Sequence, residues 1–401
     1  MTPAERRASG SLATIFAARM LGLFLVLPVF ALEAARYPGG DDPAVVGLAM
    51  GIYGLTQGIL QIPFGLASDR FGRKRVIVLG LLVFAIGSFI AAAAPTLGWL
   101  IAGRSLQGAG AVSAAVTALL ADQTRDIVRT KAMAMVGASI GLMFALSLVA
   151  APLLAARIGL PGLFVVTGLL ALGCIAVVLW WTPPEPRQHA NVPRGRLADV
   201  LRHPALLRLD VGVFVLHAVQ LAMWVAVPAL LVEAGLAKEA HWQVYLPAVL
   251  ASFVIMGGLF PLERRGYLRA VFLGAIGVVL LVQAGLAVAA ASPGIALLAV
   301  LLFLFFCGFN ILEATQPSLA SRLAPPQSRG AALGVYNTLQ SLGFFVGGAV
   351  GGWLAKNVGW QGLFGACATL MLVWLAVAWP MRAPPARHSA EEVLADEAQA
   401  T

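Results

Sequence analysis

The chain has 401 residues, of which 60% are hydrophobic and only 11% are charged. A soluble globular domain carries about 25% charged residues, so this composition excludes a soluble protein and predicts that lipid surrounds the chain. The net charge of +9 is also found in proteins that bind nucleic acid through its phosphates. Here, however, the basic residues lie in short segments between apolar runs, as in membrane proteins, and we expect no nucleic-acid partner.

Apolar runs of about the length of a membrane span, roughly 20 residues, follow one another along the chain. The first six cover residues 12–35, 44–67, 75–94, 97–121, 132–156 and 160–181. After a polar stretch, six more cover 207–232, 242–262, 268–291, 294–317, 330–355 and 358–380. The sequence predicts an all-α integral membrane protein with twelve transmembrane helices in two six-helix bundles, at 1–181 and 207–381, with a cytoplasmic linker at 182–206 and a short cytoplasmic tail at 382–401.

The distribution of basic residues predicts how the chain lies in the membrane. Arg6 and Arg7 precede the first run as in a secretory signal, but that run is too long for one and contains Arg19. We therefore interpret this run as a transmembrane span that is not cleaved off as a signal peptide. Of the 27 Lys and Arg residues, 21 lie on the side of both termini and 4 on the other side. Because positive loops stay inside, both termini are predicted to be cytoplasmic.

The loop after the second run combines glycines, an acid and several bases. It reads Gly65-Leu-Ala-Ser-Asp69-Arg70-Phe-Gly72-Arg73-Lys-Arg. The glycines permit a tight turn and close helix approach, and an aspartate is favoured near a helix N-terminus. A loop that only kept positive charge inside would need the bases but neither the glycines nor Asp69.

This loop resembles the signature loop of the major facilitator superfamily. The resemblance implies that Asp69 meets the start of the eleventh span, near Gly330 and Gly334, and that Arg73 meets Asp122 at the end of the fourth. It also implies a fold that alternates between inward-open and outward-open states by rocking of the two bundles.

The fourth run carries a charge inside the membrane, at Arg104, followed by Gln107, Gly108 and Gly110. A charge there costs about 2.5 to 3.5 kcal/mol on insertion scales, so Arg104 needs a partner within the bundle. The stretch resembles the family's second motif. As a dinucleotide fingerprint it fails, because the third glycine is missing and no strand precedes it. No phosphate-binding loop for ATP occurs, so a gradient or the substrate itself must supply the energy.

The fifth run holds a small-residue pair, Gly137 and Gly141, and then Ala151 and Pro152. The glycine-rich antiporter motif of the family ends near this point in Gly-Pro, so the match is partial. Further runs, Ile52 to Gln57, Gln61 to Gly65, Gly308 to Ala314 and Gly334 to Tyr336, resemble the YajR-type branch of drug/proton-antiporter-like transporters. Members of that branch can carry a soluble domain after the last span, and we expect its function to be absent here.

Three ionisable residues inside the runs are candidates for proton coupling: Glu313, Arg19 and His217. Glu313 is interpreted as the one acid deep within a run, and it shares a helix face with Asn310. Arg19 either binds an anionic group, sets the pKa of Glu313 or anchors the helix by snorkelling. His217 can titrate near neutral pH, although a purely structural histidine is the alternative, as a pair with an arginine is for Glu313.

Polar and aromatic side chains at helical spacing form stripes that either line a substrate cavity or pack between helices. One stripe is Tyr53, Gln57 and Gln61, and another is His217, Gln220 and Trp224. The predicted cavity residues are Tyr53, Gln57, Gln61, Gln107, Gln220, Trp224, Asn310, Tyr336, Asn337 and Gln340.

Together these features predict a secondary active transporter that exports a small organic molecule, drug-like or a metabolite, in exchange for protons. The alternatives are a facilitator or proton symporter that imports a metabolite, and a membrane receptor that transports nothing. No catalytic constellation occurs, so we expect no enzyme, and we expect neither cofactor nor metal, because the three cysteines stand alone inside apolar runs. The expected partners are the substrate, protons and lipid, for a monomer in a bacterial inner membrane.

Overall fold

The computed structural model describes residues 1–185, 200–325 and 328–381, and every regular element within these ranges is helical. The all-α architecture predicted from the sequence is therefore confirmed. Part of the predicted linker and the whole predicted tail lie outside the described residues.

The helices of the first half of the chain precede residue 185. They are α1 (Pro3–Phe24), α2 (Leu27–Ala34), α3 (Pro43–Phe71), α4 (Arg73–Ala92), α5 (Leu97–Ala109), α6 (Ser113–Asp122) and α7 (Asp126–Ala176), followed by the π-helical turn η1 (Val177–Trp181). The second half contains α9 (Pro204–Glu233), η2 (Lys238–Ala240), α10 (Trp242–Leu262), η3 (Glu263–Tyr267), α11 (Leu268–Ala289), α12 (Ile295–Leu323) and α13 (Arg329–Ala378).

Nine helices in the described ranges are long and apolar enough to cross a membrane. Two of them, α7 and α13, contain a glycine with left-handed φ, at Gly159 and Gly359, where the helical path is interrupted and the chain changes direction. Each therefore provides two spans, and α5 with α6 provides one more, broken at residues 110–112. This gives the twelve spans that the apolar runs predicted.

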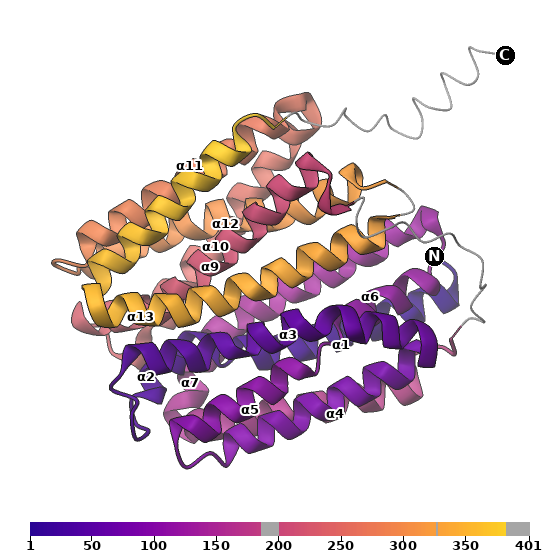
Figure 1. The fold of residues 1–401 in the computed structure, drawn as a ribbon, viewed down its shortest axis with the longest axis horizontal. Helices are drawn as coiled ribbons and strands as arrows, with labels where there is room; N and C mark the ends of the chain where they lie inside the picture. The colour runs from indigo at the N-terminus through magenta and orange to yellow at the C-terminus, as the bar shows by residue number, and fades with distance from the viewer. Residues whose placement is uncertain (186–199, 326–327, 382–401) are drawn as a thin grey trace.

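One end of the molecule carries the N-terminus and the α3–α4 loop, and we call it the terminal face; the other end, with the loop from Ala35 to Asp42, is the opposite face (Figure 1). Most predicted span ends agree closely with the helices. The exceptions are α1, α7 and α12, which continue beyond their apolar runs. All three extend at the terminal face, because apolar runs mark only the part of a helix that faces lipid, whereas a helix can continue into water.

Local capping explains several helix ends. Thr2 and Glu5 form a capping box at the start of α1, and the Asp42 side chain accepts the backbone N–H of Ala44 at the start of α3, which satisfies donors that the first turn leaves free. Gly72 separates α3 from α4 with a φ of 99°, a conformation that only glycine adopts without strain.

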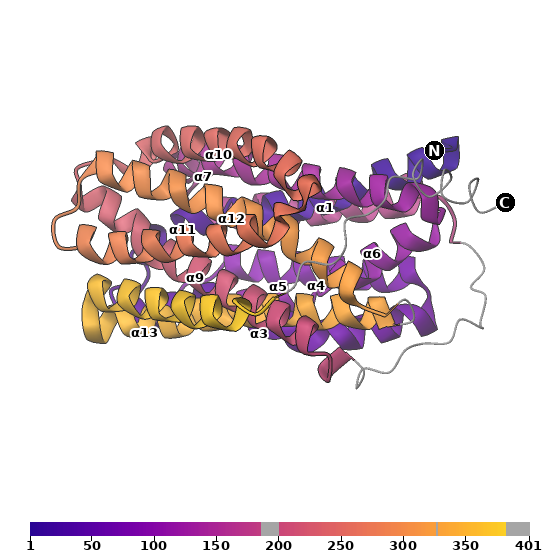
Figure 2. The same cartoon turned by 90° about the horizontal axis from the view of Figure 1, so that it is seen from above.

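The two halves of the chain meet along two seams. Helix α3 packs against α13, and α7 packs against α10; Figure 2 shows these two pairs on different sides of the molecule. At the opposite face, α2 also packs against α9. Within each half, α1 lies along α7, and α9 lies along α13.

Glycines make the α3–α13 seam tight toward the opposite face. A Cβ atom placed on Gly47 would lie 2.2 Å from the backbone oxygen of Gly348, and one on Gly352 would lie 2.3 Å from that of Pro43. Toward the terminal face, no described atom of another element lies within 4 Å of a Cβ placed on Gly330 or Gly334, and α3 and α13 diverge (Figure 1). The two halves are thus closed together at the opposite face and spread at the terminal face.

Candidate functional site

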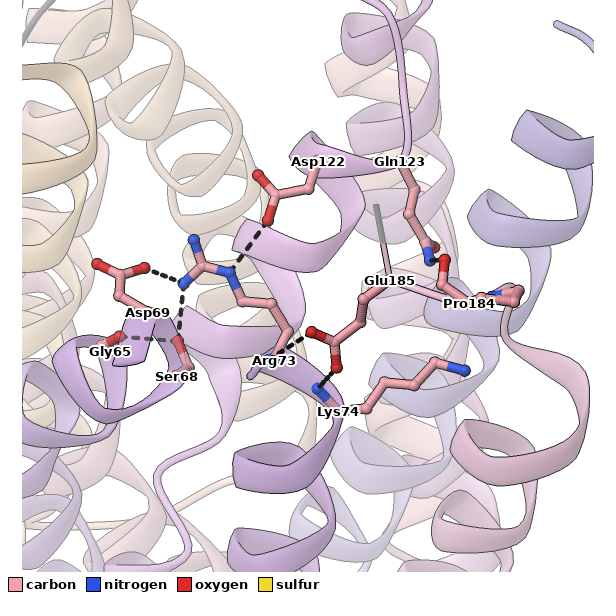
Figure 3. Close-up of polar contacts among 9 residues, drawn as sticks. All are labelled: Gly65, Ser68, Asp69, Arg73, Lys74, Asp122, Gln123, Pro184 and Glu185. Carbon is pink, nitrogen blue, oxygen red and sulfur yellow. Dashed lines mark hydrogen bonds and ion pairs between the residues drawn. The ribbon is translucent and has the colours of Figure 1, made fainter. Parts of the chain in front are cut away.

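The α3–α4 loop holds a compact ionic network centred on Arg73 (Figure 3). The Arg73 guanidinium donates to the Ser68 hydroxyl at 2.8 Å and forms ion pairs with Asp69 and, at 3.1 Å, with Asp122. Ser68 in turn donates to the backbone oxygen of Gly65 at 2.7 Å. One arginine therefore connects the end of α3, the start of α4 and the end of α6.

The structure places Arg73 against Asp122, as the family resemblance implies. It pairs Asp69 with Arg73 in the same half of the chain. Among the described atoms of other elements, none lies within 4 Å of a Cβ placed on Gly330 or Gly334. The guanidinium of Arg70 lies 5.5 Å from the ring centre of the adjacent Phe71. The conformational roles of these residues stay predictions.

Arg104 is fully buried in the first half. It donates to the side-chain oxygen of Gln107 at 3.0 Å and to the backbone oxygen of Met50 at 3.2 Å, and its guanidinium lies 5.2 Å from the ring centre of Tyr53. Gln107 donates onward to Ser88 at 2.8 Å. The partner that Arg104 was expected to need is thus a set of neutral oxygens and a ring.

Tyr53 is also bound by Arg19, through its hydroxyl group. The guanidinium of Arg19 donates to the Tyr53 hydroxyl and to the hydroxyl of Ser113, both at 2.8 Å, and only 2% of Arg19 is exposed. Tyr53 therefore lies between two buried arginines. Among the described residues no carboxylate forms an ion pair with either of them, so the core of the first half carries two charges that only neutral groups solvate.

Close backbone packing supports this arrangement. A Cβ on Gly108 would lie 2.2 Å from the backbone oxygen of Tyr53, so the fourth span needs a glycine there to approach α3. Pro152 lies within α7, near the opposite face, and lines a small cavity with Glu33 and Lys238.

A second cluster lies in the other half and joins three predicted residues. His217 Nε2 lies 3.2 Å from Glu313 Oε2, and the Gln340 amide nitrogen lies 2.8 Å from His217 Nε2 and 3.3 Å from Glu313 Oε1. These side chains come from α9, α12 and α13. The side chain of His217 is 2% exposed and that of Glu313 is 38% exposed. The structure therefore brings Glu313 to His217 and not to Arg19 or Arg104.

The positions of the hydrogen atoms in this cluster follow from its geometry. His217 Nδ1 lies 2.8 Å from the backbone oxygen of Val213, an acceptor, so Nδ1 carries a proton. In a neutral imidazole Nε2 then holds only a lone pair. The contact between Nε2 and a Glu313 oxygen is attractive only if one of the two groups binds a further proton. The Gln340 amide nitrogen, however, lies within hydrogen-bond reach of both Nε2 and Glu313 Oε1, so its N–H groups can bridge the pair without a further proton. A proton shared directly between Nε2 and Glu313 would take the place of one of these bonds.

The remaining cavity candidates are dispersed. Asn310 donates to Ser252 on α10 at 2.8 Å and is 9% exposed, which makes it a packing contact between helices. Trp224 meets the ring of Tyr245 edge to face, with centroids 5.4 Å apart. The backbone oxygen of Asn337 accepts from Ser341. Some candidates keep buried polar atoms without a hydrogen-bond partner in the described structure: Gln57, Gln61, Gln220 and Tyr336.

Sequence reasoning missed two polar features: a second buried acid and two ion pairs between the halves. Asp210, three residues inside the predicted run 207–232, is only 4% exposed, so a second acid is buried near the end of a span. At the opposite face, Lys238 binds Glu33 at 2.6 Å and Lys356 binds Asp42 at 2.7 Å. Both pairs join the two halves, and nothing local in the sequence indicates them.

The described residues contain no group of three or more His, Cys, Asp or Glu side chains that could hold a metal ion. Cys174, Cys307 and Cys367 are buried and free.

Known transport proteins are similar to this chain in sequence and in fold. The chain is 43% identical to the inner membrane transport protein YajR of Escherichia coli over 96% of its own length and 85% of that protein. It is 29% identical to the multidrug resistance protein MdtH of Aeromonas salmonicida over 86% of each chain. The structure of the nucleoside transporter NupG has the same fold, with a TM-score of 0.74 and 14% identity over 93% of this chain and 99% of that one. Residues 12–348 and 262–399 match the Major Facilitator Superfamily. The chain therefore belongs to the Major Facilitator Superfamily, and it is a transporter and not an enzyme.

Proposed function

We propose that this protein is a proton-coupled exporter of small organic molecules in a bacterial inner membrane, with both termini in the cytoplasm. The terminal face is then the cytoplasmic face, and residues 1–181 and 207–381 are the two bundles that rock against each other. The names of two relatives support this assignment, one an inner membrane transport protein and one a multidrug resistance protein. So does the asymmetry of the α3–α13 seam, which is tight at one face only.

The observation that carries proton coupling is the contact between His217 and Glu313, 3.2 Å apart. A proton bound by this pair would link the imidazole and the carboxylate directly, in place of the bridge through the Gln340 amide. Movement of α12 or α13 against α9 would separate the two groups and leave a carboxylate whose proton affinity depends on its new surroundings. Proton binding would then depend on the conformational state, which is what coupling requires. One proton crossing 100 mV supplies about 2.3 kcal/mol, enough to concentrate a substrate severalfold.

The test compares Glu313→Gln with the parent protein in inverted membrane vesicles whose lumen is acidified by respiration. A pH-sensitive dye reports the gradient, and ethidium and tetracycline serve as probes of small organic substrates. Exchange predicts that adding a probe to the parent releases protons from the lumen, whereas a proton symporter would not respond to a probe added outside. Glu313→Gln keeps the shape of the side chain but fixes a neutral form, so it should abolish this response.

The matched control is Glu233→Gln, since Glu233 is exposed at the opposite-face end of α9. It should retain the full response at equal expression. If Glu313→Gln still dissipates the gradient on probe addition, Glu313 is not the coupling group, and His217 and Glu33 are the next candidates. A parent that responds to neither probe would reject export of this class of molecule.

A further inference from the structure

The first turn of α4 is capped by a residue from a distant part of the chain. Glu185 accepts the backbone N–H of Arg73 at 3.0 Å and that of Lys74 at 2.6 Å, one with each carboxylate oxygen (Figure 3). Gly72 occupies the N-cap position and has no side chain to offer. A carboxylate at a helix N-terminus satisfies free donors and interacts favourably with the helix dipole. Glu185 therefore replaces the local cap that α4 lacks.

Neighbouring contacts fix the segment from Thr182 to Glu185 on the same surface. The Lys74 ammonium donates to the backbone oxygen of Thr182 at 2.6 Å, and the Gln123 amide donates to that of Pro183 at 2.9 Å. Just before this segment, the Arg7 guanidinium donates to the backbone oxygen of Trp181 at 2.7 Å. The chain thus leaves the first half along a path attached to α1, α4 and the residue after α6.

This attachment point and the ionic network of the loop share one residue. The backbone N–H of Arg73 binds Glu185, while its guanidinium binds Asp69 and Asp122. Fixing the backbone of Arg73 in the first turn of α4 sets where its guanidinium can reach. Glu185 is also the point from which the chain continues, through residues 186–199, to the second half.

We propose that Glu185 is a positioning residue of the conformational switch: it holds Arg73 where it retains Asp69 in its own half, and so favours the state that is spread at the terminal face. This inference rests on the alternating-access part of the proposed function and requires neither protons nor an identified substrate. Without Glu185 the first turn of α4 loosens and Arg73 binds Asp69 less well. The population then shifts toward the state in which Asp69 meets the start of α13, the contact that the family resemblance implies.

The experiment measures conformation directly in purified protein in lipid nanodiscs. Spin labels on cysteines at Lys131 and Tyr267, two exposed residues at the terminal face of the first and second halves, report the distance between the halves in a background without the native cysteines. The variants are Glu185→Ala, Glu185→Gln, which keeps the size and one acceptor oxygen, and the control Glu233→Gln. Each is also made with Asp69→Asn, and thermal unfolding verifies that each variant is folded.

We expect Glu185→Ala to shift the distance distribution toward shorter values, changing the ratio of spread to closed molecules by about threefold or more, the size expected for the loss of a helix cap. Glu185→Gln should shift it less, and the control should not shift it. In the Asp69→Asn background the Glu185 substitutions should have no further effect, because no carboxylate remains to be released. An equal shift in that background would reduce Glu185 to a merely structural cap, and no shift or a shift to longer distances would overturn the proposal. This experiment uses no transport probe, so a failure of the Glu185 proposal can be distinguished from a failure of the proton-coupling proposal.

Discussion

The glycine contacts between α3 and α13 lead to a prediction about Gly348→Ala. A Cβ at this position would lie 2.5 Å from the backbone oxygen of Gly47 and 2.7 Å from the backbone nitrogen of Gly51. Ordinary contacts of a Cβ atom begin near 3.4 Å, so the seam must open by almost 1 Å. Both neighbours are backbone atoms, and no side-chain rotation can provide that space.

The cost of such overpacking is about 1 to 3 kcal/mol, and it applies only to the state in which the opposite face is closed. A differential free energy of that size changes the ratio of two states by about 5- to 150-fold. Gly348→Ala should therefore populate molecules that are open at the opposite face, without impairing either half on its own.

The assay is the distance between spin labels on cysteines at Pro38 and Ser292, both exposed at the opposite face of the two halves. Gly257→Ala is the matched control, because no described atom of another element lies within 4 Å of a Cβ at that glycine. Gly334→Ala, equally unobstructed in this state, should shift the equilibrium the other way if α3 and α13 meet there when the terminal face closes. An unchanged distance distribution for Gly348→Ala would refute the argument.

Three further outcomes follow from the ionic contacts. The Asp69→Asn protein should insert and fold normally, but its probe-driven proton release in inverted vesicles should be severalfold lower. The reason is that a charge near a helix terminus contributes about 0.3 to 2 kcal/mol. Equal activity of the variant and the parent at matched expression would contradict this role. Arg104→Leu should lower the thermal unfolding temperature, because the Gln107 oxygen and two backbone carbonyls lose their hydrogen-bond donor. Each buried group left unpaired costs about 1 to 3 kcal/mol. A fully stable variant would show that these groups find other partners. The hydrogen bond from Lys356 holds the pKa of Asp42 below its ordinary value. The ion pair therefore stabilises the closed opposite face fully at any pH above the ordinary pKa of an aspartate. This stabilisation is lost as the pH falls through the lowered pKa of Asp42, where the carboxylate becomes protonated. Opposite-face distances should therefore lengthen on acidification below pH of about 4, and Asp42→Asn should remove that part of the response.

Much of the fold followed from the sequence because lipid imposes a simple rule on helices. An apolar run of sufficient length must be a helix, so the span positions could be read directly. The interruption at residues 110–112 could not, since the run 97–121 is continuous in hydrophobicity and only Gly110 hints at a break. The extensions of α1, α7 and α12 beyond the lipid were also invisible to an analysis that counts apolar residues.

The sequence predicted which residues form the candidate site but not which of them contact one another. Glu313 and His217 were each identified as proton candidates, yet their proximity depends on how α9 and α12 are rotated about their axes, which a single sequence does not encode locally. The pairing of Arg73 with Asp122 was available from the family resemblance. The cap from Glu185 was not, because it joins residues 111 and 112 positions apart and serves a helix whose own N-cap is a glycine.

The break between α5 and α6 has a consequence for how the protein is made. Backbone groups freed by a helix interruption cannot face lipid, and Ala111 and Val112 are accordingly buried by neighbouring helices. Arg104, in the same span, donates to Gln107 of that span and to the backbone oxygens of Ala49 and Met50 on α3. Lipid alone therefore solvates the fourth span poorly, and α3 and α4, which pack against α5, cover its polar groups. We expect the fourth span to insert most readily after the first three spans are in the bilayer.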